Sequence, residues 1–267
     1  MEFKELQLKD IPNIKHLQPN GWSDIVPEFE FYVNSPYCFP IKTEIDNQIV
    51  GIGAAIKYGE TAWLAHIIVD PDHRRKGIGS KIVEVLLKYL DSRSVDTCLL
   101  IATEMGLPVY ENAGFRIIYG YTYLKKETSN QTVNVSDHIM PFTAEYADLI
   151  YKLDREVTGE NREWLLSGFL DGSYVFWENN MVKGYYLPNL REGLIIAKNA
   201  IAGIELLKLK IQSHEKIVLP SANKPAIEFL VNDGYVFLET KGIRMIRGRN
   251  ITWYPNKIFS RIGGNFG

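Results

Sequence analysis

The sequence contains little cysteine and no long apolar run, and each absence excludes a class of protein. Only Cys38 and Cys98 occur in 267 residues, and both lie among apolar or aromatic neighbours. This usage predicts buried free thiols of a cytoplasmic protein rather than a disulfide framework. A catalytic cysteine is disfavoured because neither residue has an obvious histidine partner nearby in the sequence. Since no apolar run reaches about 18 residues and no charged-then-apolar leader is present, we expect neither a membrane span nor export.

An excess of positive charge is lacking as well. The net charge is −2 and the pI is about 6.2, which argues against a general binder of nucleic acid or of a membrane surface. The chain does have 46% hydrophobic and 23% charged residues, a composition typical of a globular protein with a sizeable core. Its length allows two modest domains or one large one.

The most informative stretch is 63–90, whose pattern predicts a strand, a basic loop and a helix. Residues 63–69 are apolar and rich in β-branched side chains, as in a buried strand. Asp70 and Pro71 end that strand, because proline cannot continue a ladder and aspartate favours turns. From Ile78 onward the apolar residues recur at helical spacing.

The loop between this strand and this helix has the composition of an anion-binding site. The first N–H groups of a helix have no intrahelical acceptor, and the helix dipole adds partial positive charge there. Gly77 and Gly79 would let an anion approach the backbone, and residues 74–76 add three positive charges. The stretch therefore predicts a phosphate or pyrophosphate site. The alternative is a basic turn that only starts a helix.

The pattern V-D-P-x-x-R-x-x-G-x-G over residues 69–79 resembles the acetyl-CoA motif of the GCN5-related N-acetyltransferases, the GNAT family. It differs from a P-loop, G-x-x-x-x-G-K-[ST], and from the dinucleotide motif G-x-G-x-x-G. In the GNAT family the loop amides hold the CoA pyrophosphate, and the end of the preceding strand pairs with the pantetheine arm. The resemblance implies these acetyl-CoA-binding positions: Ile67, Ile68, Val69, Arg74, Arg75, Lys76, Gly77, Ile78, Gly79 and Ser80.

A second motif supports the same resemblance. Residues 96–103 predict another buried strand, and residues 104–115 predict a short helix opened by a proline and closed by a glycine. The pattern V-Y-x-x-x-G-F over 109–115 resembles the family motif in which a short helix carries a tyrosine near the CoA sulfur. Tyr110 matches that tyrosine. The alternative is an aromatic residue that serves packing alone.

Two elements before this stretch bear on the site. Residues 23–33 predict a short aromatic helix, which by the resemblance would lie over the acceptor side of the cleft. Residues 41–45 and 49–58 flank an Asp-Asn pair and predict a hairpin. Glycines at 51 and 53 in its second strand indicate a bulge or a close backbone approach.

The second half of the sequence repeats the first in degraded form. Residues 193–235 again give strand, helix, strand and a proline-to-glycine helix, so the two halves should fold alike. Only Lys198-Asn199 stands between that strand and helix, and Leu230 occupies the position of Tyr110. The second copy has therefore lost both the glycine loop and the candidate acid.

These observations predict an α/β (α+β) chain of two GNAT-like domains, each a mixed, mostly antiparallel sheet flanked by helices. We expect an acetyl-CoA-binding catalytic domain at 1–127, a polar linker at 128–134 and a degenerate domain at 135–267 that shapes the acceptor site. Charged residues at 154–162 resemble a segment common in bacterial acetyltransferases built as tandem halves. The alternative for that segment is a charged helix start with exposed ion pairs.

Acetyl transfer to an amine requires a neutral amine and protonation of the leaving thiolate, and the sequence offers candidates for both tasks. Tyr110 is the candidate acid. Glu104, just after a predicted strand, and His66, within the central strand, are the candidate bases, although a histidine in an apolar strand is commonly a core residue. Water acting through Glu60 or another residue is a further route that stays open.

The sequence thus predicts an N-acetyltransferase that moves an acetyl group from acetyl-CoA, without a metal, to a primary amine of a small molecule or peptide. The amine would attack the thioester directly. One alternative is a non-catalytic acyl-CoA-binding sensor or protein-interaction module. Another is an aminoacyl-tRNA-dependent transferase of two similar halves. The intact loop and the acidic pI argue against this second alternative. We expect no nucleic-acid or membrane partner. The sequence leaves open whether the protein forms a homodimer and which amine is its acceptor.

Overall fold

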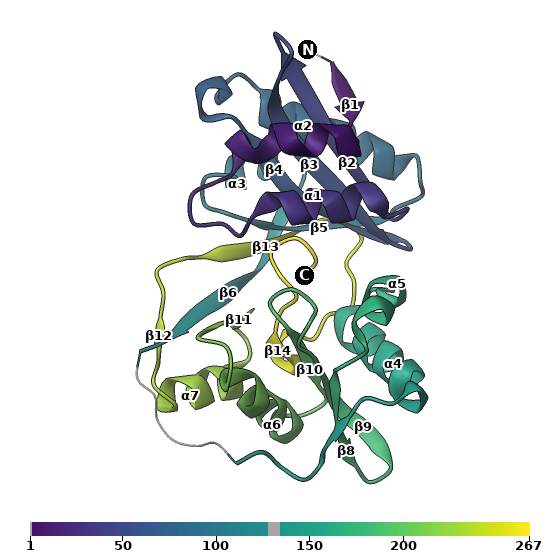
Figure 1. Cartoon of the computed structure of the whole chain (residues 1–267), viewed down its shortest axis with the longest axis vertical. Coiled ribbons are helices and arrows are strands. Elements are labelled where there is room, and N and C mark those ends of the chain that lie inside the picture. Colours follow the sequence, from purple (N-terminus) through teal and green to yellow (C-terminus); the bar gives the residue numbers. More distant parts are fainter. Residues whose placement is uncertain (1, 128–133) are drawn as a thin grey trace. The chain divides into compact units, whose positions relative to one another are not determined.

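The computed structural model describes residues 2–127 and 134–267 and has a mixed α/β secondary structure (Figure 1). Its contacts divide the chain into two compact units. The first comprises Met1–Ile117, Met245–Arg249 and Gly264–Phe266, and the second comprises Ile118–Arg244, Asn250–Gly263 and Gly267. Within the described ranges, none of the helices combines the length and the apolar character needed to cross a membrane.

The first unit is built around an antiparallel sheet that gains one parallel strand. The strands follow the order β1-β2-β3-β4-β5, and residues 245–248 of β13 continue the order beside β5. All neighbours from β1 to β4 are antiparallel, whereas β4 and β5 run parallel. The elements are β1 (Phe3–Glu5), a 3-10 helix (Leu8–Leu17), α1 (Ile25–Asn34), β2 (Cys38–Ile45), β3 (Gln48–Tyr58), β4 (Thr61–Val69), a 3-10 turn (Pro71–His73), α2 (Ile78–Asp91), β5 (Thr97–Ala102) and α3 (Leu107–Asn112).

The predicted hairpin and the predicted glycine approach are both confirmed. Asp46 and Asn47 connect β2 to β3 with φ angles of 50° and 63°, the left-handed pair that a two-residue hairpin turn requires. A Cβ built on Gly53 would lie 2.7 Å from Cγ2 of Ile82, so α2 packs directly on the backbone of β3. The facing strand β4 carries a bulge: the register with β3 shifts here, and His66 has a φ of 49°.

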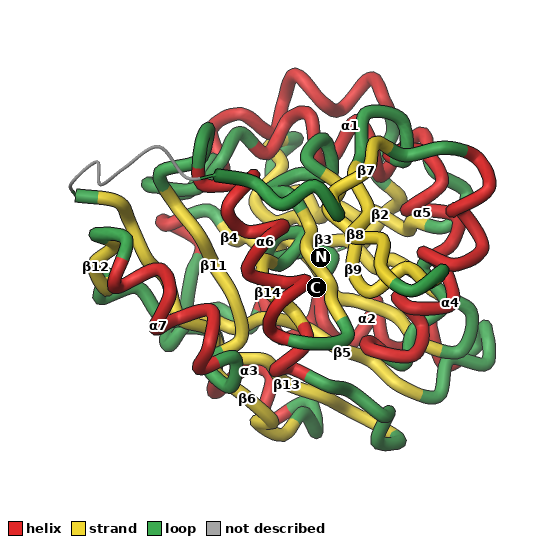
Figure 2. The backbone as a smooth tube through the Cα atoms, turned by 90° about the horizontal axis from the view of Figure 1, so that it is seen from below, coloured by secondary structure: helices red, strands yellow, loops and turns green. Residues whose placement is uncertain are grey.

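The second unit contains a five-stranded sheet of order β14-β10-β9-β8-β7, and α6 packs against β8, β9, β10 and β14. Figure 2 draws α6 as a red helix and the strands in yellow. In the same unit β6 pairs antiparallel with β11 and β12. The elements from residue 116 onward, of which β6 and β13 belong partly to each unit, are β6 (Arg116–Lys126), β7 (Ile139–Pro141), α4 (Ala147–Thr158), α5 (Glu163–Leu166), β8 (Tyr174–Glu178), β9 (Met181–Leu187), β10 (Leu194–Ala197), α6 (Ala200–Ile211), β11 (Lys216–Pro220), α7 (Lys224–Asn232), β12 (Tyr235–Phe237), β13 (Gly242–Gly248) and β14 (Ile258–Ser260), with 3-10 turns at Ala144–Tyr146, Ser167–Phe169 and Pro255–Lys257.

The repeat predicted from the sequence is present in the order of the elements. The series β8-β9-β10-α6-β11-α7 matches β2-β3-β4-α2-β5-α3, and Asn179-Asn180 form a left-handed hairpin turn like that of Asp46-Asn47. The helix α7 is followed by a glycine with a φ of 87°, and α3 by one with a φ of 86°. The copies differ beside the central strand, because β14 pairs with β10 whereas β5 pairs with β4.

The compact units do not coincide with the domain ranges expected from the sequence. The expected first domain ends at residue 127, yet the structural division falls after Ile117, because residues 121–126 of β6 pair with β11 and β12. Most of the expected linker at 128–134 lies outside the described residues. The roles assigned to the ranges 1–127 and 135–267 stay predictions.

The charged segment at 154–162 contains a buried ion pair, so the exposed-ion-pair alternative is wrong for that pair. Asp154 and Arg162 are 1% and 3% exposed, respectively. The Arg162 guanidinium donates to both carboxylate oxygens of Asp154, at 3.0 and 2.5 Å, and the Tyr185 hydroxyl donates to Oδ1. Burial, followed by the Asp154 charge, raises the pKa of Tyr185 and keeps it a donor. Arg155, by contrast, is exposed.

Breaking this buried pair should destabilise the second unit strongly. We expect Arg162→Leu to lower the free energy of unfolding by about 3–5 kcal/mol, because it leaves the Asp154 charge buried without its partner. Arg155→Leu is the matched control on the same segment and should cost less than about 1 kcal/mol. Urea unfolding followed by tryptophan fluorescence compares the two variants. Equal losses would show that the buried pair contributes no more than an exposed arginine.

Candidate functional site

The loop between β4 and α2 contains two left-handed residues and leads into an uncapped helix start. Gly77 is the N-cap of α2 with φ 77° and ψ 2°, and no side chain caps the helix start. Arg75, two residues earlier, is also left-handed, with a φ of 60°. Left-handed residues at such spacing turn successive N–H groups toward one point. The first turn of α2 adds further N–H groups without intrahelical acceptors, since its helical bonding starts with Lys81 N to Gly77 O.

The basic side chains of the loop are exposed, so their charge is presented outward. Arg74, Arg75 and Lys76 are all exposed. Two of them also brace the loop: Arg74 Nε donates to Val69 O at 3.1 Å, and Lys76 Nζ donates to Asp72 O at 3.1 Å. The arrangement is electropositive and open, as a phosphate site requires.

The glycines of the loop have different reasons to be glycine. A Cβ on Gly77 would meet nothing within 4 Å, so its φ of 77° is what favours glycine there. Gly79 has no such angle, and a Cβ there would make only ordinary contact, 3.7 Å from Val69 Cγ2. Nothing inside the fold therefore forces glycine at 79, which fits a position that an external group approaches closely.

The end of β4 has one edge left unpaired by β5. The parallel pairing of β4 with β5 runs from Thr61 to Trp63 in the described part of the chain, whereas pairing with β3 continues to Val69. Residues 67–69, which precede the loop, can thus offer backbone groups on the β5 side to an extended ligand.

Tyr110 lies on α3, which follows β5 as the basic loop follows β4. Because β4 and β5 are parallel, both connections leave the same edge of the sheet, and α3 contacts α2. The Tyr110 ring meets Phe115 edge to face at 6.1 Å. A Cβ on Gly106 would lie 3.0 Å from the Tyr110 ring, so this glycine makes room for it. Burial raises the pKa of Tyr110 above its usual range, so the phenol stays protonated at neutral pH.

The acidic candidates lie at opposite ends of the sheet. Glu104 lies in the exposed turn between β5 and α3, at the edge shared by the loop and Tyr110. Glu60 precedes β4, whose nine residues separate it from the loop by about 30 Å at the usual rise of a strand. Glu60 therefore lies far from the loop, from Tyr110 and from Glu104, at the other end of the sheet.

His66 is half-buried at the bulge of β4 and belongs to a polar network within the first unit. Its Nδ1 lies 2.8 Å from the hydroxyl of Tyr32 on α1. The Asn265 amide donates to the same hydroxyl oxygen at 2.7 Å and to Glu28 Oε2 at 2.9 Å. Phe29 and Trp22 pack around the imidazole at ring distances of 5.8 and 5.9 Å.

Sequence reasoning missed Glu28, Tyr32 and Asn265 as neighbours of His66. Tyr32 lies in the predicted aromatic helix and is fully buried. Asn265 follows the glycine pair at 263–264, a pattern that indicates only a bend or a tail. No local pattern links residue 265 to residue 66, because the contact depends on how the whole chain folds.

The second copy of the loop differs at the point where an anion would bind. The N-cap of α6 is Asn199, whose side chain accepts from the N–H of Ala202 at 2.9 Å. In α2 no side chain caps the equivalent N–H group, whereas in α6 the Asn199 side chain occupies it. At the position equivalent to Tyr110, Leu230 is fully buried in the core of the second unit.

Cys98 does not have the setting of a nucleophile. Both cysteines are free thiols. Burial raises the pKa of the Cys98 thiol to about 11, with Arg247 opposing the shift, and only the thiolate is nucleophilic. Cys98 is therefore inert at neutral pH.

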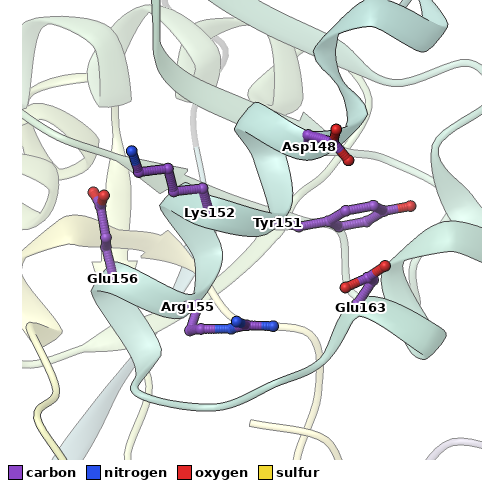
Figure 3. A pocket seen from close by; sticks show the side chains of 6 residues that line it. All are labelled: Asp148, Tyr151, Lys152, Arg155, Glu156 and Glu163. Carbon is purple, nitrogen blue, oxygen red and sulfur yellow. The ribbon is translucent and has the colours of Figure 1, made fainter.

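A pocket of about 400 Å³ lies in the second unit and contains none of the predicted site residues (Figure 3). Tyr151 points between Asp148 and Glu163 in this view, and side chains of both charges surround it. Burial, and then the two carboxylates, raise the pKa of Tyr151. The residues that line this pocket are Asp148, Tyr151, Lys152, Arg155, Glu156 and Glu163. Among the described residues no cluster of three or more His, Cys, Asp or Glu side chains could hold a metal ion.

Comparisons with solved structures identify the fold. A Pyrococcus horikoshii protein classed as an acetyltransferase is 20% identical, with a TM-score of 0.82 over 100% of this chain and 95% of that chain. A GCN5-related N-acetyltransferase from Sphaerobacter thermophilus is 12% identical, with a TM-score of 0.63 over 95% and 98%. One from Anabaena variabilis is 11% identical, with a TM-score of 0.58 over 93% and 73%. At these identities the likeness concerns the fold alone, which is GNAT-like, as the sequence predicts.

One family model matches the N-terminal part of the chain. Residues 7–115 match the family model described as the Acetyltransferase (GNAT) family, and they lie within the first compact unit. The N-terminal part of the chain thus matches a GNAT acetyltransferase domain. A search among curated proteins found no match.

Proposed function

We propose that the chain is an acetyl-CoA-dependent N-acetyltransferase whose catalytic domain is the N-terminal part, within residues 1–127. It transfers the acetyl group of acetyl-CoA to a primary amine of a small molecule or peptide by direct attack on the thioester. Two free thiols support a reducing compartment such as the cytoplasm. The second part, within 135–267, shapes the acceptor side.

The observation that carries this proposal is the loop at the end of β4. It combines a left-handed, uncapped N-cap at Gly77, exposed positive charge at 74–76 and a strand edge that β5 leaves unpaired. A pyrophosphate fits the N–H groups at the start of α2, and an extended amide-containing arm fits the edge of β4. The family match over 7–115 includes all these residues. CoA supplies both a pyrophosphate and such an arm.

In the proposed chemistry, Tyr110 stabilises the leaving CoA thiolate, and a base removes a proton from the acceptor amine. A lysine-like amine with a pKa of about 10.4 is neutral in only about one molecule in 10³ near pH 7, so a base assists. Glu104 and His66 are the candidates, both on the loop side of β4 and β5 rather than at the Glu60 end. Amide groups at the end of β4 polarise the thioester carbonyl.

Thiol release from acetyl-CoA across a panel of primary amines tests the activity. The panel should contain polyamines, amino acids, aminoglycosides and peptides with free N-termini or lysines, with product masses measured in parallel. Turnover with an amine, accompanied by a mass gain of one acetyl group, is the expected result. Tight acetyl-CoA binding without turnover on any amine would favour a non-catalytic acyl-CoA sensor instead.

We further expect one acetyl-CoA per chain, bound by the first unit. In the second unit the Asn199 side chain occupies an N–H at the start of α6, and side chains replace the loop glycines. Isothermal titration of the full chain with acetyl-CoA should give a stoichiometry of one, and Asn199→Gly should not add a second site. A second site of comparable affinity that survives Gly77→Glu would reverse the assignment of the two parts.

A further inference from the structure

The pocket in the second unit lies over the exposed face of α4 (Figure 3). Five of its six lining residues recur at helical spacing and share that face, and they are Asp148, Tyr151, Lys152, Arg155 and Glu156. The sixth, Glu163, comes from the start of α5. The pocket volume of about 400 Å³ falls within the range of small-molecule sites, about 300–1,000 Å³.

The turn that brings Glu163 to this pocket is fixed by the core of the second unit. Gly159 ends α4 with a φ of 72°, and a Cβ there would lie 2.3 Å from Thr252 O, so only glycine fits. Arg162, directly before Glu163, donates two hydrogen bonds to the buried carboxylate of Asp154. The backbone that carries Glu163 is therefore held in place before any ligand binds.

The carboxylates at one end of the pocket are not neutralised by the protein. Tyr151 points between Asp148 and Glu163 (Figure 3). Among the described residues, neither carboxylate takes part in a hydrogen bond or an ion pair. Burial raises the pKa of Tyr151, the charges of Glu163 and Asp148 raise it further, and no cation in the described part of the chain opposes them. The potential at the phenol oxygen is therefore negative.

The basic side chains of the pocket are directed elsewhere. Lys152 points away from Tyr151 (Figure 3), and Arg155 donates to Oδ1 of Asn161 at 2.9 Å. Glu156 lies 3.8 Å from the ammonium of Lys198, so its charge is partly balanced. The pocket is thus polarised, with uncompensated negative charge at the Tyr151 end.

We propose that this pocket binds a primary alkylammonium group between Asp148 and Glu163, with the alkyl chain against the ring of Tyr151. An ammonium has only donors and a carboxylate only accepts, so the two form charge-assisted hydrogen bonds. The aromatic face attracts the same charge. The ring also covers carbon, which favours an organic cation over an inorganic one. A diamine and the amino end of a zwitterion both supply this group.

Three probes of equal carbon chain length test the class of ligand. Cadaverine has an ammonium at each end, δ-aminovalerate has one ammonium and one carboxylate, and valerate has only the carboxylate. We expect cadaverine and δ-aminovalerate, but not valerate, to shift the Tyr151 signal saturably in NMR of the full chain at neutral pH, with carbon-13 in its 15 tyrosine rings. Tyr151→Phe assigns the signal.

The relative affinities of the probes identify the source of the ammonium. Tighter binding of cadaverine would indicate a diamine, one ammonium for each carboxylate. Tighter binding of δ-aminovalerate would indicate a zwitterion whose carboxylate meets Lys152. A valerate shift as large as that of cadaverine would overturn the assignment of a cation.

A pair of charge-matched variants locates the binding. Asp148→Asn/Glu163→Gln removes both carboxylates at nearly constant size, and we expect cadaverine affinity to fall at least about 10-fold, because hydrogen bonds to charged groups are the stronger ones. The control Asp171→Asn/Glu228→Gln removes two exposed carboxylates of the same unit outside the pocket and should bind as the wild type. Circular dichroism verifies that both variants fold.

Equal cadaverine affinity in the two double variants, or a shift that never saturates, would overturn the proposal and make this surface a solvated helix face. The measurement requires no turnover. If no amine were acetylated, the proposed function would fail while the binding result still stood.

Discussion

Gly77→Glu should nearly abolish acetyl-CoA binding while leaving the fold intact. The substitution places a negative charge at the N-cap of α2, where the pyrophosphate is proposed to lie, and it sets an L-residue at a φ of 77°. At an effective dielectric of about 20, two unit charges about 4 Å apart repel by about 4 kcal/mol. We expect affinity by calorimetry to fall by at least about 100-fold, with an unchanged circular dichroism spectrum.

Two controls separate charge from backbone strain. Gly77→Gln has the same size and the same strain of about 1–2 kcal/mol but no charge, so it should bind acetyl-CoA at least about 10-fold more tightly than Gly77→Glu. Gly172→Glu introduces the same residue at a φ of 75° in the second unit and should bind as wild type. Wild-type affinity in Gly77→Glu would remove the pyrophosphate from this loop.

Tyr110→Phe should lower kcat by about 10²–10⁴-fold, the usual contribution of a general acid, with the acetyl-CoA dissociation constant changed less than about 3-fold. Phenylalanine preserves the packing against Gly106 and Phe115, so the variant removes only the hydroxyl. That hydroxyl acts mainly in the transition state, as the sulfur departs, and its loss therefore appears in kcat rather than in binding. Single-turnover kinetics ensure that the chemical step is measured.

The pKa of Tyr110 also determines how the rate depends on pH. Burial disfavours the phenolate and raises the pKa, so the proton is present from neutral pH to above the ordinary value of about 10. Deprotonation of Tyr110 should therefore not lower kcat at any pH below about 10. Tyr37→Phe, an exposed tyrosine of the same unit, is the matched control and should leave kcat unchanged. Full activity in Tyr110→Phe would make Tyr110 a packing residue.

The raised pKa refines the chemistry expected from the sequence. Full transfer of a tyrosine proton to a thiolate is uphill by about 2 kcal/mol at reference pKa values of about 10 and 8.5, and burial makes it more so. Tyr110 would therefore stabilise the developing thiolate through a hydrogen bond while keeping its proton. Such a bond still favours the transition state, because charge on sulfur is greatest there.

The sequence by itself determined the parts of this protein that depend on short-range patterns. The apolar run before the loop, the loop glycines and the helical spacing after them specify strand, loop and α2, because each follows from neighbouring residues. The repeat of elements in the second half and its lack of loop glycines were equally readable, since α6 and α7 obey the same local rules. The left-handed conformation of Gly77, by contrast, is known only from the structure.

Tertiary structure alone decided the surroundings of His66 and of the segment at 154–162. Strand alternation could not place His66, because a bulge changes the face of a side chain, and the bulge forms only against β3. Asn265 reaches Tyr32 across 233 residues of sequence, a contact that no local pattern encodes. Burial of Asp154 and Arg162 likewise depends on elements packed around them, because burial is a property of neighbours distant in the chain.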